Sequence, residues 1–138
     1  MELPIKVQGV VYTKPNQKIE YLLIKRNKKD GAFWQSVTGT LEEGETLKNC
    51  LIREIKEELG ITNIKNISNI KQIIQWPKEN NFIITEYVFI VEINKNQKIT
   101  LSKEHTNYKW CNFKEAYQIL EKENNKNTLK LINKELIN

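Results

Sequence analysis

Three glutamates near the middle of the chain are the residues whose spacing points most directly to chemistry. Glu54, Glu57 and Glu58 lie in residues 46–59, where apolar side chains recur at helical spacing. These apolar residues are Leu47, Cys50, Leu51 and Ile55. On a helical wheel at about 100° per residue, the three carboxylates fall along the edge of the apolar stripe. The pattern therefore predicts an amphipathic helix that keeps three acids partly buried.

Partly buried carboxylates indicate a bound cation. They lose hydration and repel one another, which is unfavourable unless positive charge compensates them. Mg²⁺ takes oxygen ligands and typically bridges carboxylates to substrate phosphates. A Glu-rich helix is more often a solvated face with ion pairs between successive turns, but such a face lies opposite the apolar stripe. The placement of these acids therefore favours a site for a metal ion and a phosphate group.

Glycines and strands define the elements that would position these acids. Gly44 lies in a loop before the expected helix, and Gly60 lies where a left-handed C-terminal cap is needed. Runs of β-branched and aromatic residues predict strands at residues 5–13, 20–26, 82–93 and 108–110, the first two forming a hairpin. Turns are expected at residues 14–17, 76–81 and 94–97, and a mostly extended segment at residues 64–74.

Two more helices are expected near the C-terminus. The first is predicted at residues 113–122 with Asn112 as its N-cap, and the second at residues 128–136. The asparagine-rich residues 124–127 are expected to break the chain between them. This order of elements by itself indicates an α/β or α+β fold.

Length and composition fit one globular domain spanning residues 1–138. That length suits a sizeable core, and no apolar run reaches the length of a membrane span. Residues 1–4 lack the basic start and apolar stretch of a signal peptide, so we expect a cytoplasmic protein with no membrane partner. Cys50 and Cys111 lack a close spacing and are expected to be reduced core residues.

The net charge of +5 is consistent with an anionic partner. A mildly basic surface attracts polyphosphates, although Lys, Asn and Ile are abundant throughout and the charge can simply reflect that bias. A basic stripe interleaved with aromatic residues, typical of nucleic-acid binding, is not seen in the sequence. An RNA-binding module, which would show steep salt dependence, is therefore less favoured than an enzyme for small polyphosphates.

Residues 39–61 resemble the Nudix box, G-x5-E-x7-R-E-U-x-E-E-x-G-U with U aliphatic. The matching residues are Gly39, Glu45, Arg53, Glu54, Ile55, Glu57, Glu58, Gly60 and Ile61. Every specified position is filled, so the match is far more specific than a short glycine motif. The resemblance implies the Nudix fold, a mixed β-sheet sandwiched between α-helices.

Two further segments resemble particular Nudix hydrolases. Residues 33–39 are similar to bacterial dihydroneopterin triphosphate diphosphatases, also described as dATP pyrophosphohydrolases. Residues 104–110 are similar to the same enzymes and to asymmetric diadenosine tetraphosphate hydrolases. The stretch between the central helix and Glu104 is shorter than in the pterin enzymes and lacks their basic, aromatic insert, which helps to hold substrate.

The resemblance implies a metal site and catalytic groups. Its metal-binding residues would be Glu54, Glu57, Glu58, Glu104 and the carbonyl of Gly39. Glu57 or Glu104 would act as general base, and His105 is a rival that we rank lower. Arg53 would serve catalysis mainly as a structural partner of Glu45 that orients the loop.

The resemblance also implies substrate contacts. Arg26 would bind phosphate, and Thr38 would contact the substrate through its hydroxyl or backbone. Trp34 would either stack on a base or pterin or pack in the core, and Lys6 is a weaker candidate.

The implied reaction is Mg²⁺-dependent hydrolysis of a triphosphate with release of pyrophosphate, with Mn²⁺ as a substitute metal. The expected substrate is a small molecule, dihydroneopterin triphosphate or dATP, and the enzyme is expected to be a monomer or homodimer. An asymmetric dinucleoside polyphosphate hydrolase is the alternative within the same chemistry. A non-catalytic nucleotide-binding Nudix domain is a further alternative, against which the intact acids argue.

Overall fold

The computed structural model describes residues 4–138. The first three residues, on which most of the signal-peptide expectation rests, lie outside this range. The strands are β1 (Ile5–Thr13), β2 (Glu20–Arg26), β3 (Trp34–Gln35), β4 (Val37–Thr40), β5 (Asn66–Ile67), β6 (Gln72–Lys78), β7 (Phe82–Glu92) and β8 (His105–Cys111). The helices are α1 (Leu47–Leu59), α2 (Phe113–Ile119) and α3 (Glu123–Ile137).

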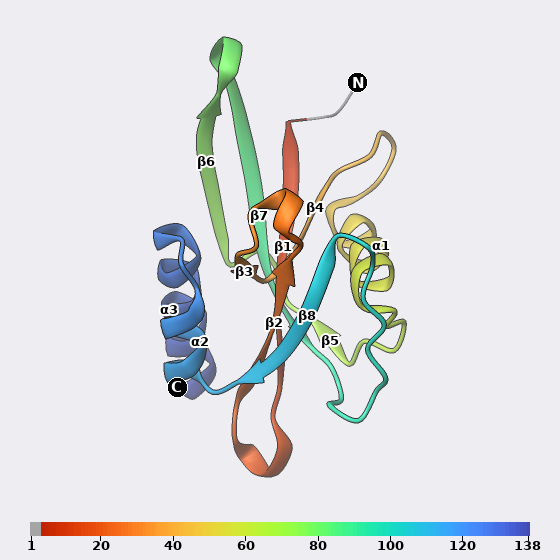
Figure 1. Ribbon diagram of the computed structural model, residues 1–138, viewed down its shortest axis with the longest axis vertical. Coiled ribbons are helices and arrows are strands. Elements are labelled where there is room, and N and C mark those ends of the chain that lie inside the picture. Colours follow the sequence, from red (N-terminus) through yellow and green to blue (C-terminus); the bar gives the residue numbers. More distant parts are fainter. Residues whose placement is uncertain (1–3) are drawn as a thin grey trace.

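The strands form one mixed sheet that lies between two helical layers. β1 pairs parallel with β7 and antiparallel with β2 and β4, while β8 pairs with β2 and β6 with β7. Helix α1 lies on one side of this sheet, and α2 and α3 lie on the other (Figure 1). The expected mixed sheet between helices is therefore confirmed.

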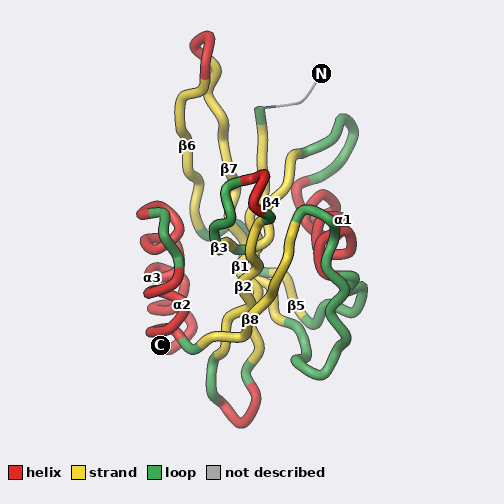
Figure 2. The backbone as a smooth tube through the Cα atoms, viewed as in Figure 1, coloured by secondary structure: helices red, strands yellow, loops and turns green. Residues whose placement is uncertain are grey.

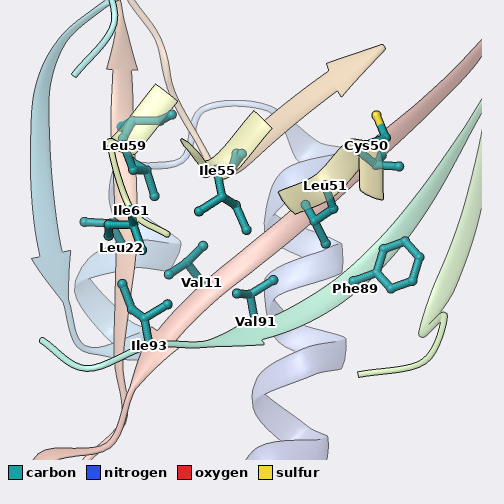
Figure 3. Packing of buried hydrophobic residues seen from close by; sticks show 13 residues of the cluster. Val11, Leu22, Cys50, Leu51, Ile55, Leu59, Ile61, Phe89, Val91 and Ile93 are labelled. Atoms are coloured by element: carbon teal, nitrogen blue, oxygen red, sulfur yellow. The ribbon is translucent and has the colours of Figure 1, made fainter. Parts of the chain in front are cut away.

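Side-chain alternation along β1 separates two cores. Val11 points toward α1, whose Leu51, Ile55 and Leu59 pack over it (Figure 3). Val7, on the same face of β1, belongs to the same cluster. Val10 points to the other side, where α2 and α3 supply the second cluster. Residues that alternate with the first set, such as Lys6 and Gln8, therefore share the α2–α3 side of the sheet.

Local signals fix the ends of α1. Thr46 is its N-cap, with the hydroxyl accepting a hydrogen bond from the Asn49 N–H at 3.1 Å. Gly60 ends the helix with a φ of 70°, the left-handed conformation predicted from the sequence. The predicted bounds of β1 and β2, and their pairing as a hairpin, are also confirmed.

Two predicted interruptions differ from the structure. Of the turn expected at residues 76–81, Glu79–Asn81 form a short 3-10 helix between β6 and β7, but residues 76–78 belong to β6. Pro77 is tolerated there because β6 is an edge strand. The expected break at residues 124–127 forms the first turns of α3. Asparagine is a weak helix former, but burial of Thr128, Leu129 and Ile132 on the same helix stabilises it.

Strand β8 is longer than predicted and begins at His105, so Glu104 lies in a turn at the end of the preceding loop, directly before the strand. The two short strands β3 and β4 were not predicted. Cys50 and Cys111 are free and buried, as expected. No helix within residues 4–138 is both long enough and apolar enough to cross a membrane.

Candidate active site

Gly39 and Glu54 show how closely β4 approaches α1. A Cβ atom placed on Gly39 would overlap the carboxylate of Glu54. Only glycine at position 39 therefore leaves room for the Glu54 side chain, which is mostly buried. Burial raises the pKa of Glu54, and the neighbouring Arg53 guanidinium opposes that rise.

Glu58 is the most deeply buried acid of this group. It is 4% exposed, and its Oε2 has no hydrogen-bond partner among residues 4–138. Burial, together with the charges of Glu54 and Glu104, raises the pKa of Glu58 to about 8. A buried carboxylate with an unpartnered oxygen is unfavourable, so a cation is the natural compensation.

Glu104 reaches Glu58 from a distant part of the sequence. The loop before β8 runs beside α1 (Figure 2), where the Ser102 N–H donates to the carbonyl of Glu58 at 3.4 Å. Ligand atoms of Glu58, Glu104 and His105 lie within 4.8 Å of one another. The side chain of Glu104 is 61% exposed and therefore accessible to a substrate or to water.

Glu54, Glu58 and Glu104 interact through their charges and are hereafter the acid cluster. These three acids fit a hard divalent cation. Their donor atoms are all carboxylate oxygens, the ligands that Mg²⁺ prefers. The unpartnered Oε2 of Glu58 supplies an independent reason for a cation at this point. The Gly39 carbonyl remains a proposed additional ligand.

Glu57 differs from its two neighbours on α1. Its side chain is 56% exposed, and it accepts a hydrogen bond from Arg53 at 3.2 Å. The prediction that all three helical glutamates are partly buried is therefore wrong for Glu57. Its carboxylate reaches the Arg53 guanidinium at the surface instead.

Arg53, on α1, forms hydrogen bonds that hold the loop before α1 against the helix. Its guanidinium donates to both carboxylate oxygens of Glu45, at 2.7 and 3.0 Å, to Glu54 at 2.7 Å and to the Thr40 carbonyl at 3.1 Å. The hydrogen bonds from Arg53 lower the pKa of Glu45 to about 2. The expected pairing of Arg53 with Glu45 is present, and it makes Arg53 a residue that positions Glu54.

His105 is buried and neutral. Burial, followed by the charge of Arg26, lowers its pKa to about 4. Its Nε2 lies 3.2 Å from the side-chain nitrogen of Gln35, and its Nδ1 lies 3.5 Å from the Ser102 hydroxyl. Because an amide nitrogen only donates, Nε2 is the acceptor here and is already occupied. This arrangement favours Glu104 over His105 as the proton acceptor.

A cleft of about 520 Å³ opens on the α2–α3 side of the sheet. It is lined by Lys6, Arg26, Phe33, Gln35, Thr38, Ile74, Trp76, Glu86, Lys122, Asn124 and Asn125. Of the predicted substrate contacts, Arg26, Thr38 and Lys6 line this cleft. Trp34 does not, because it packs against the core beneath α2 and α3. The adjacent Phe33 lines the cleft instead, with the Lys122 ammonium 3.9 Å from its ring centre.

Arg26 belongs to the cleft and also approaches the acid cluster. The pairing of β2 with β8 shifts register between Lys25 and Arg26, which re-aims this side chain. Its ion pairs with Asp30 and Glu104 are long, at 3.6 and 3.9 Å, and its Nε has no hydrogen-bond partner among the described residues. A guanidinium with spare donors suits phosphate binding.

Comparison with known proteins decides the family. A family model described as NUDIX domain matches residues 4–133. The chain belongs to the Nudix family. It is 31% identical over 133 residues to a dihydroneopterin triphosphate diphosphatase of Haemophilus influenzae, covering 88% of this chain and 82% of that protein. It is 29% identical over 118 residues to an asymmetrical bis(5'-nucleosyl)-tetraphosphatase of Caenorhabditis elegans, covering 83% and 84%.

The structure of the Escherichia coli dihydroneopterin triphosphate pyrophosphohydrolase superposes with a TM-score of 0.79 at 25% identity, covering 96% of this chain and 97% of that one. The predicted membership of the Nudix family is thus confirmed. The protein is a Nudix pyrophosphohydrolase, so the alternative of a non-catalytic Nudix domain is set aside.

Several residues of the Nudix cleft were not predicted from the sequence. They are Phe33, Gln35, Ile74, Trp76, Glu86, Lys122, Asn124 and Asn125. A signal for Glu86 was available, because an acid in the β-branched run of residues 82–93 breaks its apolar character. The others come from segments that only the tertiary structure brings together.

Proposed function

We propose that this Nudix hydrolase cleaves a small-molecule triphosphate carrying a heteroaromatic group and releases pyrophosphate. The observation that carries the proposal is the position of Arg26, which lines the cleft and lies 3.9 Å from Glu104 of the acid cluster. A phosphate chain bound by Arg26 would have the acids at one side and the cleft at the other. Lys6 and Thr38 line the same cleft and would add phosphate contacts.

Mg²⁺, or Mn²⁺ in its place, would be held by Glu54, Glu58 and Glu104, with the Gly39 carbonyl as a further ligand. When bound, the metal neutralises phosphate charge and favours ionisation of water. Glu104 accepts a proton from the attacking water, a role that its exposure supports. Arg53 positions Glu54 and holds Glu57, so Glu57 is the weaker candidate for the base.

The substrate we favour is dihydroneopterin triphosphate or dATP. The relative from Haemophilus influenzae and the Escherichia coli structure, both named for dihydroneopterin triphosphate, support this choice. The asymmetrical bis(5'-nucleosyl)-tetraphosphatase relative supports diadenosine tetraphosphate as the alternative. A single domain spanning residues 1–138, a cytoplasmic location and a monomeric or homodimeric state stay predictions from the sequence.

Product analysis by ³¹P NMR tests the proposal. The enzyme is incubated with Mg²⁺ and, separately, with dihydroneopterin triphosphate, dATP, nucleotide sugars and diadenosine tetraphosphate. We expect pyrophosphate and a monophosphate from a triphosphate, and no turnover after chelation of the metal. Release of ATP from diadenosine tetraphosphate at a far higher kcat/KM would assign the protein to the alternative.

A further inference from the structure

A second carboxylate site lies in the cleft, separate from the acid cluster. Glu86 is on β7, and its side chain shares a face with Val88, which packs toward α2 and α3. It is aligned across the sheet with Lys6 on β1 and Ile74 on β6. Glu86, Lys6 and Ile74 all line the cleft, whereas Val88 lies in the core beneath it. Glu86 is therefore on the cleft wall, and it has no part in the metal site.

The carboxylate of Glu86 is held in place by a buried amide. Glu86 is 7% exposed, and its Oε1 accepts a hydrogen bond of 2.7 Å from the Nε2 of Gln8, 78 residues away. Gln8 is itself buried on the neighbouring strand. Burial raises the pKa of Glu86, but the Gln8 hydrogen bond and the Lys6 charge both favour the ionised form. The hydrogen bond from Gln8 thus fixes the orientation of the Glu86 carboxylate and leaves its Oε2 as an acceptor for a ligand.

A purely structural role does not explain this pair. The backbones of β1 and β7 are already paired in parallel from Ile5 to Tyr12, so the strands do not need a buried side-chain bond. Burying a carboxylate is unfavourable compared with an apolar residue at the same place. Ile74 and Trp76 provide an apolar wall beside Glu86, as expected where a flat heterocycle binds.

We propose that Glu86 selects substrates whose heterocycle presents a ring N–H beside an exocyclic amino group. This inference rests on the proposed function and narrows it, because of the two substrates favoured there dihydroneopterin triphosphate carries the paired donors and dATP does not. Guanine and pterin share this pair of adjacent donors, and an ionised carboxylate, which only accepts, matches both of them. Adenine presents its amino group beside a ring nitrogen that is an acceptor, so one carboxylate oxygen would face a lone pair. Guanine or pterin triphosphates are therefore preferred over adenine triphosphates.

The test measures kcat/KM for dGTP, dATP and dihydroneopterin triphosphate, and the affinity of α,β-methylene analogues of dGTP and dATP by calorimetry. We expect the wild-type enzyme to favour the two substrates with paired donors by about tenfold to a hundredfold over dATP. Whichever of those two substrates has the higher kcat/KM identifies the source of the heterocycle as a guanine nucleotide or a pterin. Glu86→Gln replaces one acceptor oxygen by a donor, so it removes or reverses the preference.

Glu92→Gln is the matched control, because it makes the same change at the far end of β7, where Glu92 pairs with Lys65. It keeps the wild-type preference. Glu86→Ala, which buries no new polar group, loses the preference without reversing it and serves if Glu86→Gln does not fold. Equal losses on all substrates in the Glu86 variants, or a wild-type preference for dATP, would overturn the inference alone. A wild-type protein that neither binds nor cleaves any triphosphate would instead overturn the proposed function.

Discussion

The acid cluster and the cleft wall each contain a buried glutamate, and the surroundings of these two glutamates differ. Glu58 is 4% exposed, has an unpartnered oxygen and lies among other acids. Glu86 is 7% exposed, accepts from Gln8 and is near Lys6. The first arrangement lacks a compensating cation, whereas in the second the protein supplies a donor to Oε1 of Glu86 and leaves Oε2 for a ligand. We therefore propose that the same residue type serves metal binding in one region and ligand selection in the other.

The two regions also differ in how the chain assembles them. One short segment contains Gly39, Arg53 and two members of the acid cluster, Glu54 and Glu58. The third member, Glu104, comes from a distant part of the sequence. The cleft takes residues from six strands and from α3. Changes in the acid cluster should therefore affect every substrate alike, while changes in the cleft should affect substrates unequally.

The largest expected effect is at Glu58. Glu58→Gln removes a metal ligand, and we expect kcat to fall by at least about a thousandfold on every substrate, because a bound metal contributes several kcal/mol. The fold should persist, since removing a buried charge relieves its repulsion by Glu54 and Glu104. Steady-state kinetics at saturating Mg²⁺, with circular dichroism as the folding control, measure both. Near-normal turnover would remove Glu58 from the metal site.

The next effect distinguishes Glu104 from His105. We expect Glu104→Gln to lower kcat by at least about a hundredfold with little change in KM, as for loss of a general base. We expect His105→Ala mainly to lower the melting temperature, because the ring is buried and bonded to Gln35. The measurement is kcat against pH for both variants. A fall in kcat for the His105 variant alone would reverse the two roles.

The helix and its acids could be predicted because the information is local. A cap at Thr46, a stripe of apolar residues and Gly60 define α1 within one segment. The Nudix box adds Gly39, whose need for glycine becomes clear only when Glu54 is seen against it. Exposure of Glu57 could not be read from the wheel, because it depends on where Arg53 points.

The cleft could not be predicted because its parts are distant in sequence. The bond between Gln8 and Glu86 depends on the parallel pairing of β1 with β7, which no local pattern encodes. Pro77 favoured a turn in the sequence, yet it lies on the edge strand β6. On an edge strand the missing N–H of a proline does not remove a hydrogen bond between strands. The choice between Phe33 and Trp34 as the aromatic residue of the cleft depends on the side of β3 that faces the core.

A smaller effect is expected at Gly39. Gly39→Ala places a methyl group where the Glu54 carboxylate lies, so that acid must move. We expect Mg²⁺ or Mn²⁺ affinity to fall by about tenfold to a hundredfold, the range seen when groups that position ligands are changed. Calorimetric titration of the metal measures this directly.

Gly44→Ala is the matched control for Gly39→Ala. Gly44 has a φ of 85°, so the variant is strained, but a Cβ there meets nothing within 4 Å. It should lose about 1–2 kcal/mol of stability and keep its metal affinity. Equal metal affinity in the two alanine variants would contradict the proposed role of Gly39.

The smallest expected effect concerns the stability of the cleft wall. Burial raises the pKa of Glu86 above its ordinary value of 4.5, so the folded protein holds this proton more tightly than the unfolded chain. The stabilisation from Glu86 is therefore complete below pH 4.5 and declines as the pH rises through the raised pKa. The Gln8 hydrogen bond and the Lys6 charge oppose the effect of burial, so we expect the decline to be small.

Glu86→Gln removes that titration and keeps an oxygen that accepts from Gln8. Compared with the wild type, it should gain stability between acidic and neutral pH, measured by urea unfolding at several pH values in the presence of EDTA. Glu92→Gln, which loses an ion pair with Lys65 at 3.4 Å, should show no such gain. If Glu86→Gln is instead less stable at neutral pH, the carboxylate stabilises the sheet. Glu86 would then differ from Glu58 because it stabilises the sheet, and not because it selects a ligand.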